Sequence, residues 1–289
     1  MTTFAADVRY AVRALARNPG FTTIVVLTFA LGIGANSAIY SVIHGTMIQA
    51  LPYEGGGLGV VQLRQPALAN NQPDIGFSVL EILEYRDRST TLSELAEHHR
   101  LPFNLVGLGE PLRILSGVVS ANFFETIGVE PLHGRLFLPE DDRIGADAVI
   151  VLTHDFWTAQ MGGDPGVIGS TLEMNDLIHT VVGILPPVPL YPDGADLYIP
   201  TSACPFRSSE RWTDRRTQRA MSVFARLEDP SDFGRLRAEL ETISSTMHAE
   251  HPEAYPEGVG ITTTAIPLRD ALVEDGRMSF LILFATAGL

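Results

Sequence analysis

FTTIVVLTFALGIGANSAIYSVI, residues 21–43, divides this chain of 289 residues into two unequal parts. It lies inside a longer run, residues 19–53, that contains no Asp, Glu, Lys or Arg. A helix of about 23 residues extends about 34 Å, which is enough to cross a hydrocarbon core about 30 Å thick. A helix also satisfies every backbone polar group, as lipid requires. We therefore predict a transmembrane helix over residues 21–44.

The second half of this segment is made of small, weakly polar residues between Gly32 and Ala38, with Asn36 among them. Small residues let a second helix approach closely, and Asn36 can hydrogen-bond across such a contact. We read the segment as a helix that packs against other helices. A single anchor facing lipid is the alternative.

The charges on either side predict the orientation. Arg9, Arg13 and Arg17 precede the segment, and the first charge after it is Glu54. The positive-inside rule places residues 1–20 in the cytoplasm as an amphipathic segment, which ends at Asn18-Pro19-Gly20. A cleaved signal peptide is a rival reading, but the basic leader and the apolar run are both longer than is usual.

The chain ends in MSFLILFATAGL, residues 278–289. This mostly apolar run of twelve residues has about half the length that a membrane-spanning helix needs. We expect the start of a second transmembrane helix, truncated here. A buried terminal element of a soluble domain would give the same pattern.

Composition excludes several classes of protein. The net charge of −14 argues against nucleic-acid binding, which needs a basic surface. All 20 basic residues are Arg, so the chain lacks the Lys of a P-loop or of a pyridoxal Schiff base. Cys204 is the only cysteine, which rules out an internal disulfide and a cysteine metal cage. We expect it to be a small buried or loop residue.

Residues 45–277 alternate short strand and helix patterns, which predicts an α+β domain. Asn175-Asp176 is typical of a hairpin turn, and Asp164-Pro165-Gly166 of another turn. Ser120, Thr153 and Ser231 are predicted to cap helices. The predicted strands are 113–119, 148–152, 171–174, 177–185 and 222–227, and the last helix carries the apolar stripe Phe233, Leu236, Leu240, Ile243 and Met247.

We predict no catalytic, cofactor-binding or metal-binding residues, because each candidate pattern is incomplete. The Gly32-x-Gly34 pattern has Ser37 where a dinucleotide site needs a third glycine. The other candidates are His248 and His251 with Glu250, read as a solvated helix end; the adjacent pair His98-His99; Glu140-Asp141-Asp142, read as a solvated acidic turn; and the aromatic residues Phe123, Phe124, Phe156 and Trp157, read as core.

These segments together resemble a known family. RYAVRALARNPGFTTIVVLTFALGIGANSAIYSVIHGTMIQALPY, residues 9–53, is similar to the N-terminus of FtsX-like/MacB-like permeases, especially the acidobacterial-type duplicated orphan permeases. Five later segments resemble the MacB-like periplasmic core domain and occur in the same order. They are residues 117–142 (GVVSANFFETIGVEPLHGRLFLPEDD), 149–157 (VIVLTHDFW), 162–175 (GGDPGVIGSTLEMN), 179–187 (HTVVGILPP) and 196–200 (DLYIP).

The resemblance implies a bacterial inner-membrane permease of an ABC-type efflux or mechanotransmission transporter. Its periplasmic domain would have a porter-like α/β part and a strand-rich insertion. The implied partners are a cytoplasmic ABC ATPase, a second copy or duplicated half, and a periplasmic protein. The chain would be a fragment that stops in its second helix, and orphan members often lack a linked ATPase. Two other hypotheses are a single-anchor periplasmic binding or scaffold module without a transport role, and an extracytoplasmic enzyme.

Overall fold

The computed structural model describes residues 9–11, 13, 15–43, 59–188, 191 and 194–271. The chain divides into two compact units, residues 1–49 with 272–289 and residues Ala50–Ala271, and each is described by itself. The predicted second membrane segment, 278–289, lies outside the described residues.

The main helix of the first unit is α2, Pro19–Ile43. Its large apolar side chains from Phe21 to Ile33 are exposed. By length and composition, no single described helix qualifies as a membrane crossing, although a pair bent by 110°, Arg9–Arg17 with Pro19–Gly34, does.

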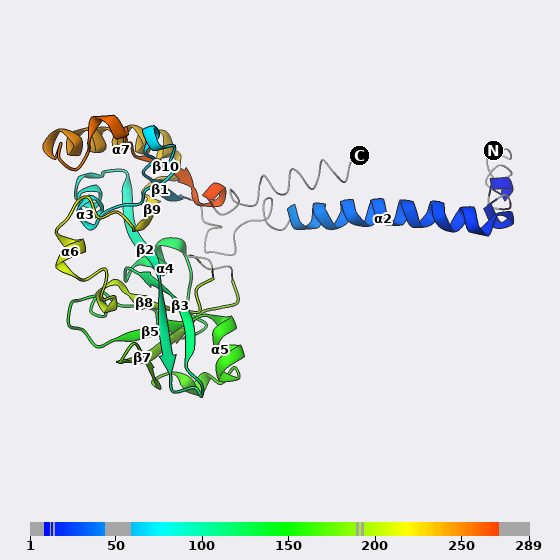
Figure 1. Ribbon diagram of the computed structural model, residues 1–289, viewed down its shortest axis with the longest axis horizontal. Helices are drawn as coiled ribbons and strands as arrows, with labels where there is room; N and C mark the ends of the chain where they lie inside the picture. Colours follow the sequence, from blue (N-terminus) through cyan, green and yellow to red (C-terminus); the bar gives the residue numbers. More distant parts are fainter. Residues whose placement is uncertain are drawn as a thin grey trace. The chain divides into compact units, whose positions relative to one another are not determined.

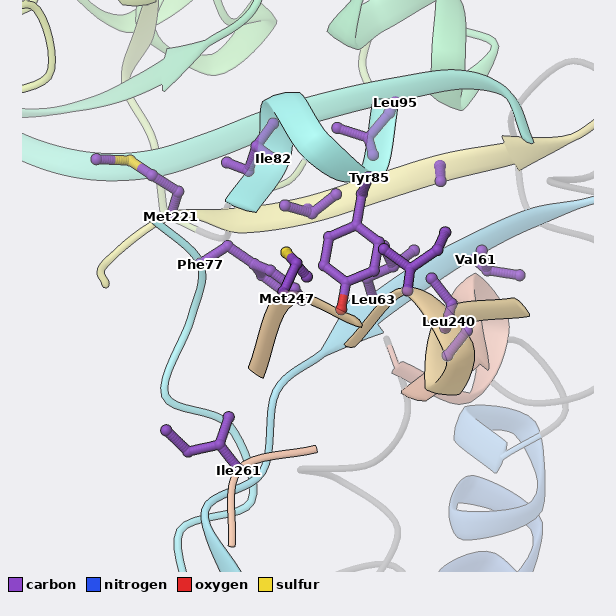
Figure 2. Packing of buried hydrophobic residues seen from close by; sticks show 14 of the residues in the cluster. Val61, Leu63, Phe77, Ile82, Tyr85, Leu95, Met221, Leu240, Met247 and Ile261 are labelled. Carbon is purple, nitrogen blue, oxygen red and sulfur yellow. The ribbon is translucent and has the colours of Figure 1, made fainter. Parts of the chain in front are cut away.

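The first and last strands of the second unit lie side by side in an antiparallel region of its sheet, which we call the four-stranded part. Its strands follow the order β10 (Thr264–Pro267), β1 (Val60–Arg64), β9 (Ser222–Leu227) and β2 (Leu92–Val106). Helices α3 (Val79–Arg88) and α7 (Phe233–Glu250) bury their apolar side chains against one face of it. Figure 2 shows this core, in which Tyr85 of α3 lies among side chains of both strands and helices.

The remaining strands close into a ring. β2 pairs with β3 (Leu112–Val119), which continues to β8 (Leu197–Pro200), β5 (Val149–Leu152), β7 (Leu177–Ile184) and β6 (Thr171–Met174), and β6 pairs back to β2. A ring of six strands is small enough for side chains to fill its interior. Its core includes Phe103, Ile114, Ile150, Leu172, Val181 and Leu197.

Shorter elements surround the four-stranded part and the ring. They are α4 (Phe123–Ile127), α5 (His154–Met161), α6 (Glu210–Thr213), β4 (His133–Gly134), and the 3-10 turns η3 (Leu68–Asn70), η4 (Pro165–Val167), η5 (Thr201–Ala203), η6 (Pro230–Asp232) and η7 (Glu257–Val259). α4 packs on β2 and β9, and Figure 1 places α5 beside the ring.

The edge strand β4 depends on two glycines. Gly134 pairs with Gly183 of β7, and a Cβ atom on Gly183 would lie 2.1 Å from the carbonyl oxygen of Arg135. Gly134 also has a φ of +72°, which favours glycine. Only a pair of residues without side chains permits this close approach.

The structure contains the strands that the sequence pattern predicts, and the Asn175-Asp176 turn adopts positive φ angles at both residues. Thr153 caps α5 by accepting a hydrogen bond from the Phe156 amide. Two predicted caps are wrong. Asn122 rather than Ser120 precedes α4, because the Ser120 hydroxyl is bonded to the Glu97 amide and to Asn122. Ser231 lies inside η6, so that Asp232 precedes α7.

Glu239 fixes α7 to the turn that links α3 to β2. Its carboxylate accepts hydrogen bonds from the Ser89 hydroxyl at 2.7 Å and from the Thr90 amide at 2.7 Å, as well as from Thr91. Partial burial opposes ionisation, but these donors outweigh it and lower the pKa of Glu239 to about 2.

We expect this carboxylate to make folding depend on pH. Because its pKa is lower in the folded chain, its stabilising contribution is complete above its ordinary pKa near 4.5 and disappears as the pH falls through about 2. The difference in unfolding free energy between the unaltered chain and Glu239→Gln should therefore be constant above pH 5 and shrink below it. Urea titrations at several pH values measure this difference. Glu241→Gln, an exposed change on the same helix, is the control, and a pH-independent difference for Glu239→Gln would contradict the assignment.

Candidate functional site

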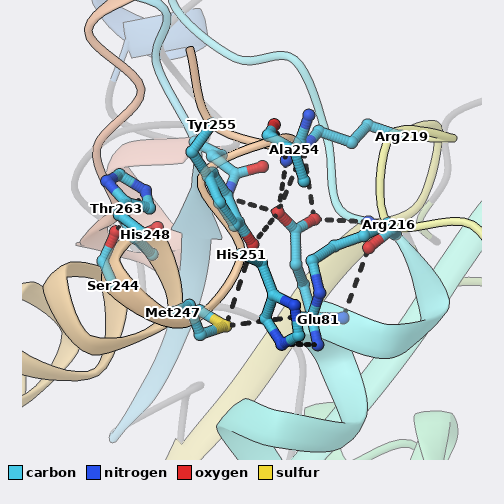
Figure 3. A network of polar contacts seen from close by, with 12 residues as sticks. Glu81, Arg216, Arg219, Ser244, Met247, His248, His251, Ala254, Tyr255 and Thr263 are labelled. Carbon is cyan, nitrogen blue, oxygen red and sulfur yellow. Dashed lines mark hydrogen bonds and ion pairs between the residues drawn. The ribbon is translucent and has the colours of Figure 1, made fainter. Parts of the chain in front are cut away.

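The most highly connected polar group in the described chain is Glu81, in the first turn of α3. Its side chain is 0% exposed. It completes a capping box by accepting from the Ser78 amide at 2.8 Å, and it accepts from the Tyr255 hydroxyl at 2.7 Å and from Arg219 Nη2 at 2.8 Å. Figure 3 shows Tyr255 and Arg219 converging on the Glu81 carboxylate.

Arg219 and Tyr255 compensate the buried charge. The Arg219 guanidinium also donates to the carbonyl oxygen of Ala254 at 3.2 Å and lies 5.0 Å from the centre of the Tyr255 ring. Burial, and then the Glu81 charge, raise the pKa of Tyr255, so its phenol remains a hydrogen-bond donor. We call Glu81, Arg219 and Tyr255 the buried hub. It joins the start of α3, the segment before β9 and the turn after α7.

The histidines at the end of α7 lie beside the buried hub. His248 packs on the Tyr255 ring, with centroids 4.2 Å apart, and its Nε2 atom is 3.3 Å from the Ser244 hydroxyl. His251 Nε2 is 3.1 Å from Arg216 Nη2, and Arg216 also pairs with Glu84. His248 is half-buried because the turn after α7 folds back onto its ring, so the expectation of a solvated helix end holds only in part.

His98 marks the point where β2 changes partners. It pairs with Ser222 of β9 on one side and with Val119 of β3 on the other. Its ring is 2% exposed and stacks on Phe224 at 4.8 Å, with Phe123 and Tyr191 at its edges. Burial lowers the pKa of His98 to about 3, so the ring is neutral in this aromatic packing.

His99 points to the other side of the same strand, as adjacent residues of a strand do. Its Nε2 atom is 3.5 Å from the sulfur of Cys204, and burial lowers the pKa of His99 to about 4. Cys204 is buried at the end of η5, and burial raises the pKa of its thiol. A neutral thiol beside a neutral imidazole is a poor nucleophile.

The acidic turn Glu140-Asp141-Asp142 is expected to be solvated, but only Glu140 is exposed. Asp141 pairs with Arg135 and accepts from the Leu138 amide at 2.7 Å. Asp142 accepts from the Thr201 hydroxyl at 2.8 Å and from the Ala121 amide at 3.2 Å. The two aspartates therefore hold loops together. Phe123, Phe124, Phe156 and Trp157 are buried in the core, as predicted.

The described residues contain no group of three or more His, Cys, Asp or Glu side chains that could hold a metal ion. Their buried polar groups are used mainly to join chain segments. The described geometry thus defines an α/β domain built on a mixed sheet of ten strands.

Residues 22–243 match the family model described as the MacB-like periplasmic core domain. The chain belongs to the MacB/FtsX-like family of ABC transporter permeases. No curated protein sequence matches it.

Solved structures share the fold at low sequence identity. The extracellular domain of the ABC-type transporter YknZ from Gram-positive bacteria has 11% identity and a TM-score of 0.50, and covers 72% of this chain and 99% of its own. The periplasmic region of MacB from Actinobacillus actinomycetemcomitans has 13% identity and a TM-score of 0.53, covering 76% and 94%. A domain of a putative permease protein from Porphyromonas gingivalis has 14% identity and a TM-score of 0.55, covering 76% and 92%.

Sequence reasoning did not find the buried hub. Ser78-x-x-Glu81 is a capping-box pattern before an apolar helix, and it could have located Glu81. Nothing local to Arg219 or Tyr255 indicates a shared partner, because they lie 138 and 174 residues from Glu81 along the chain.

We expect Glu81→Gln to destabilise the domain by about 3–5 kcal/mol, since it leaves a guanidinium buried without its counter-charge. Glu250→Gln is the matched control. It breaks the ion pair with Arg88, which is largely open to solvent, and should cost under about 1 kcal/mol. Chemical denaturation followed by near-UV circular dichroism measures both changes. Equal losses would show that the buried hub does not stabilise the fold as described.

Proposed function

We propose that this chain is the membrane-anchored permease subunit, or a fragment of it, of an ABC-type efflux or mechanotransmission transporter. α2 crosses the bacterial inner membrane with its N-terminus in the cytoplasm, and residues 45–277 form the periplasmic domain. Two observations support this proposal: the family match, and the exposed apolar surface of α2 from Phe21 to Ile33. Such a surface requires lipid or other helices around it.

The observation that carries the mechanical part of the proposal is the pairing of the domain's first and last strands. Val61 of β1 lies opposite Pro267 of β10, so the chain enters and leaves the domain at the same end of one strand pair. Segments attached there act on adjacent points of the sheet. A movement of both segments would therefore act on the same end of the β1–β10 pair.

From that pair, movement is transmitted through hydrogen-bonded strands. β1 pairs with β9, β9 with β2, and β2 belongs to the ring. Packed cores resist compression and transmit strain, so the domain is suited to move as one body. We equate the four-stranded part with the porter-like part of the family's periplasmic domain, and the ring with its strand-rich insertion.

These 289 residues contain no lysine and therefore no P-loop to bind nucleotide phosphates, which supports an energy source outside them. We propose a cytoplasmic ABC ATPase in that role, and a second copy or a duplicated half as the other permease. Residues 278–289 would start the next membrane helix. A periplasmic protein would contact the domain.

Single-cysteine labelling tests the topology. Thr3→Cys and Ser231→Cys are each made in the unaltered chain, where the buried Cys204 should not react. We expect a membrane-impermeant maleimide to label residue 231 in intact spheroplasts, and residue 3 only after the membrane is permeabilised. Labelling of residue 3 alone in intact spheroplasts would reverse the proposed orientation, and release of the domain from membranes would disprove anchoring.

Partner-dependent ATP hydrolysis tests the transport role. The tagged chain, purified in mild detergent from its native membrane, should bring with it vanadate-sensitive ATP hydrolysis. The same chain purified from a host without the native partner should have none. Absence of hydrolysis in both preparations would contradict coupling to an ATPase and favour a scaffold.

A further inference from the structure

A polar cleft with a volume of about 470 Å³ lies where the parallel strands β3 and β8 end. Ser120 to Asn122 follow β3 and Thr201 follows β8, and these residues line the cleft. The chain leaves the two strand ends by different routes, to α4 and to η5. Crevices at the carboxyl ends of parallel strands are common ligand sites in α/β proteins.

The Asp142 carboxylate also lines the cleft and is held there by neutral hydrogen-bond donors. The Asp142 carboxylate accepts hydrogen bonds from the Ala121 amide at 3.2 Å, from the Thr201 hydroxyl at 2.8 Å and from the Ser202 amide at 2.8 Å. These donors come from both strand ends. Asp142 therefore shapes the cleft and has little capacity left for a ligand.

One side of the cleft is lined by the buried ion pair of Glu97 and Arg207, and Arg207 keeps one donor group that this pair does not use. Glu97 is 4% exposed, and its carboxylate receives two hydrogen bonds from Arg207, from Nε at 2.8 Å and from Nη2 at 2.6 Å. This two-point contact fixes the plane of the guanidinium. Among the described residues, Nη1 of Arg207 has no hydrogen-bond partner, so it can donate to a ligand.

Two opposite charges at the cleft have no counter-ion in the described part of the chain. Arg86 of α3 donates to the carbonyl oxygen of Leu95 at 3.3 Å and makes no ion pair there. Glu125 of α4 lines the same cleft, and its carboxylate accepts no hydrogen bond from a described residue. Once the Glu97–Arg207 pair is set aside, the cleft offers the Arg86 cation, the Glu125 anion and the spare donors of Arg207, beside the hydrogen-bonded carboxylate of Asp142.

We propose that this cleft binds a zwitterionic ligand, an amino acid or the ends of a short peptide. The ligand carboxylate would lie between Arg86 and Arg207, and its ammonium group at Glu125. Phe137 and Pro139 add apolar surface for a side chain. This site goes beyond the proposed transport role and does not depend on it, because binding is measured without an ATPase.

Equilibrium dialysis of the full chain in nanodiscs against radiolabelled trialanine tests the proposal. We expect saturable binding that Arg86→Ala and Glu125→Gln each weaken about tenfold or more, as loss of a charged hydrogen bond does. Arg86 and Glu125 are exposed, so neither change should unfold the domain, and thermal unfolding checks this. Arg113→Ala, an exposed arginine at the far end of β3, is the matched control and should leave binding unchanged.

Blocked probes assign each end of the ligand. N-acetyl-trialanine should bind more weakly than trialanine and become insensitive to Glu125→Gln, whereas trialanine amide should become insensitive to Arg86→Ala. If alanine binds with the same affinity as trialanine, the ligand is a free amino acid. If trialanine binds more tightly than alanine, the ligand is a peptide. No saturable binding of either probe, or equal weakening by Arg113→Ala, would overturn the proposal.

Discussion

The strand β2 is the constraint on which the domain depends, because it belongs to both the four-stranded part and the ring. Its first residues, from Leu92, pair with β9 in the four-stranded part, and its later residues pair with β3 and β6 in the ring. His98 pairs in both directions. Since a strand cannot bend sharply without losing hydrogen bonds, this shared strand fixes the ring relative to the four-stranded part.

Two kinds of packing support this strand. At the junction, the neutral ring of His98 lies among aromatic side chains, where a charge would be costly. Farther from the junction, the buried hub around Glu81 joins three segments that are far apart in the sequence. The aromatic packing supports the junction of the ring and the four-stranded part, and the buried hub holds α3 and the turn after α7 together. Both contribute to one rigid body.

The sequence predicts those parts of the fold that are encoded locally. The Asn175-Asp176 turn, the Thr153 cap and the stripe on α7 each depend on residues a few positions apart, and each is found. The cap at Ser120 fails because the Glu97 amide donates to the Ser120 hydroxyl, and the cap at Ser231 fails because Ser231 lies inside η6, which is capped by Asp229. The closure of the ring by β6 and β2, the bonds of Arg219 and Tyr255 to Glu81, and the Glu97–Arg207 pair each join residues more than 60 positions apart along the chain, for which a single sequence has no local pattern.

The distance between the ring and the four-stranded part tests the central claim, that β2 makes them one body. Spin labels at Asp155→Cys on α5 and Thr242→Cys on α7, both exposed positions, report this distance by pulsed electron resonance on the full chain in nanodiscs. Cys204 is buried and should stay unlabelled. A rigid domain predicts one narrow distance distribution. Two resolved populations, or a broad distribution that narrows only when a partner is added, would contradict it.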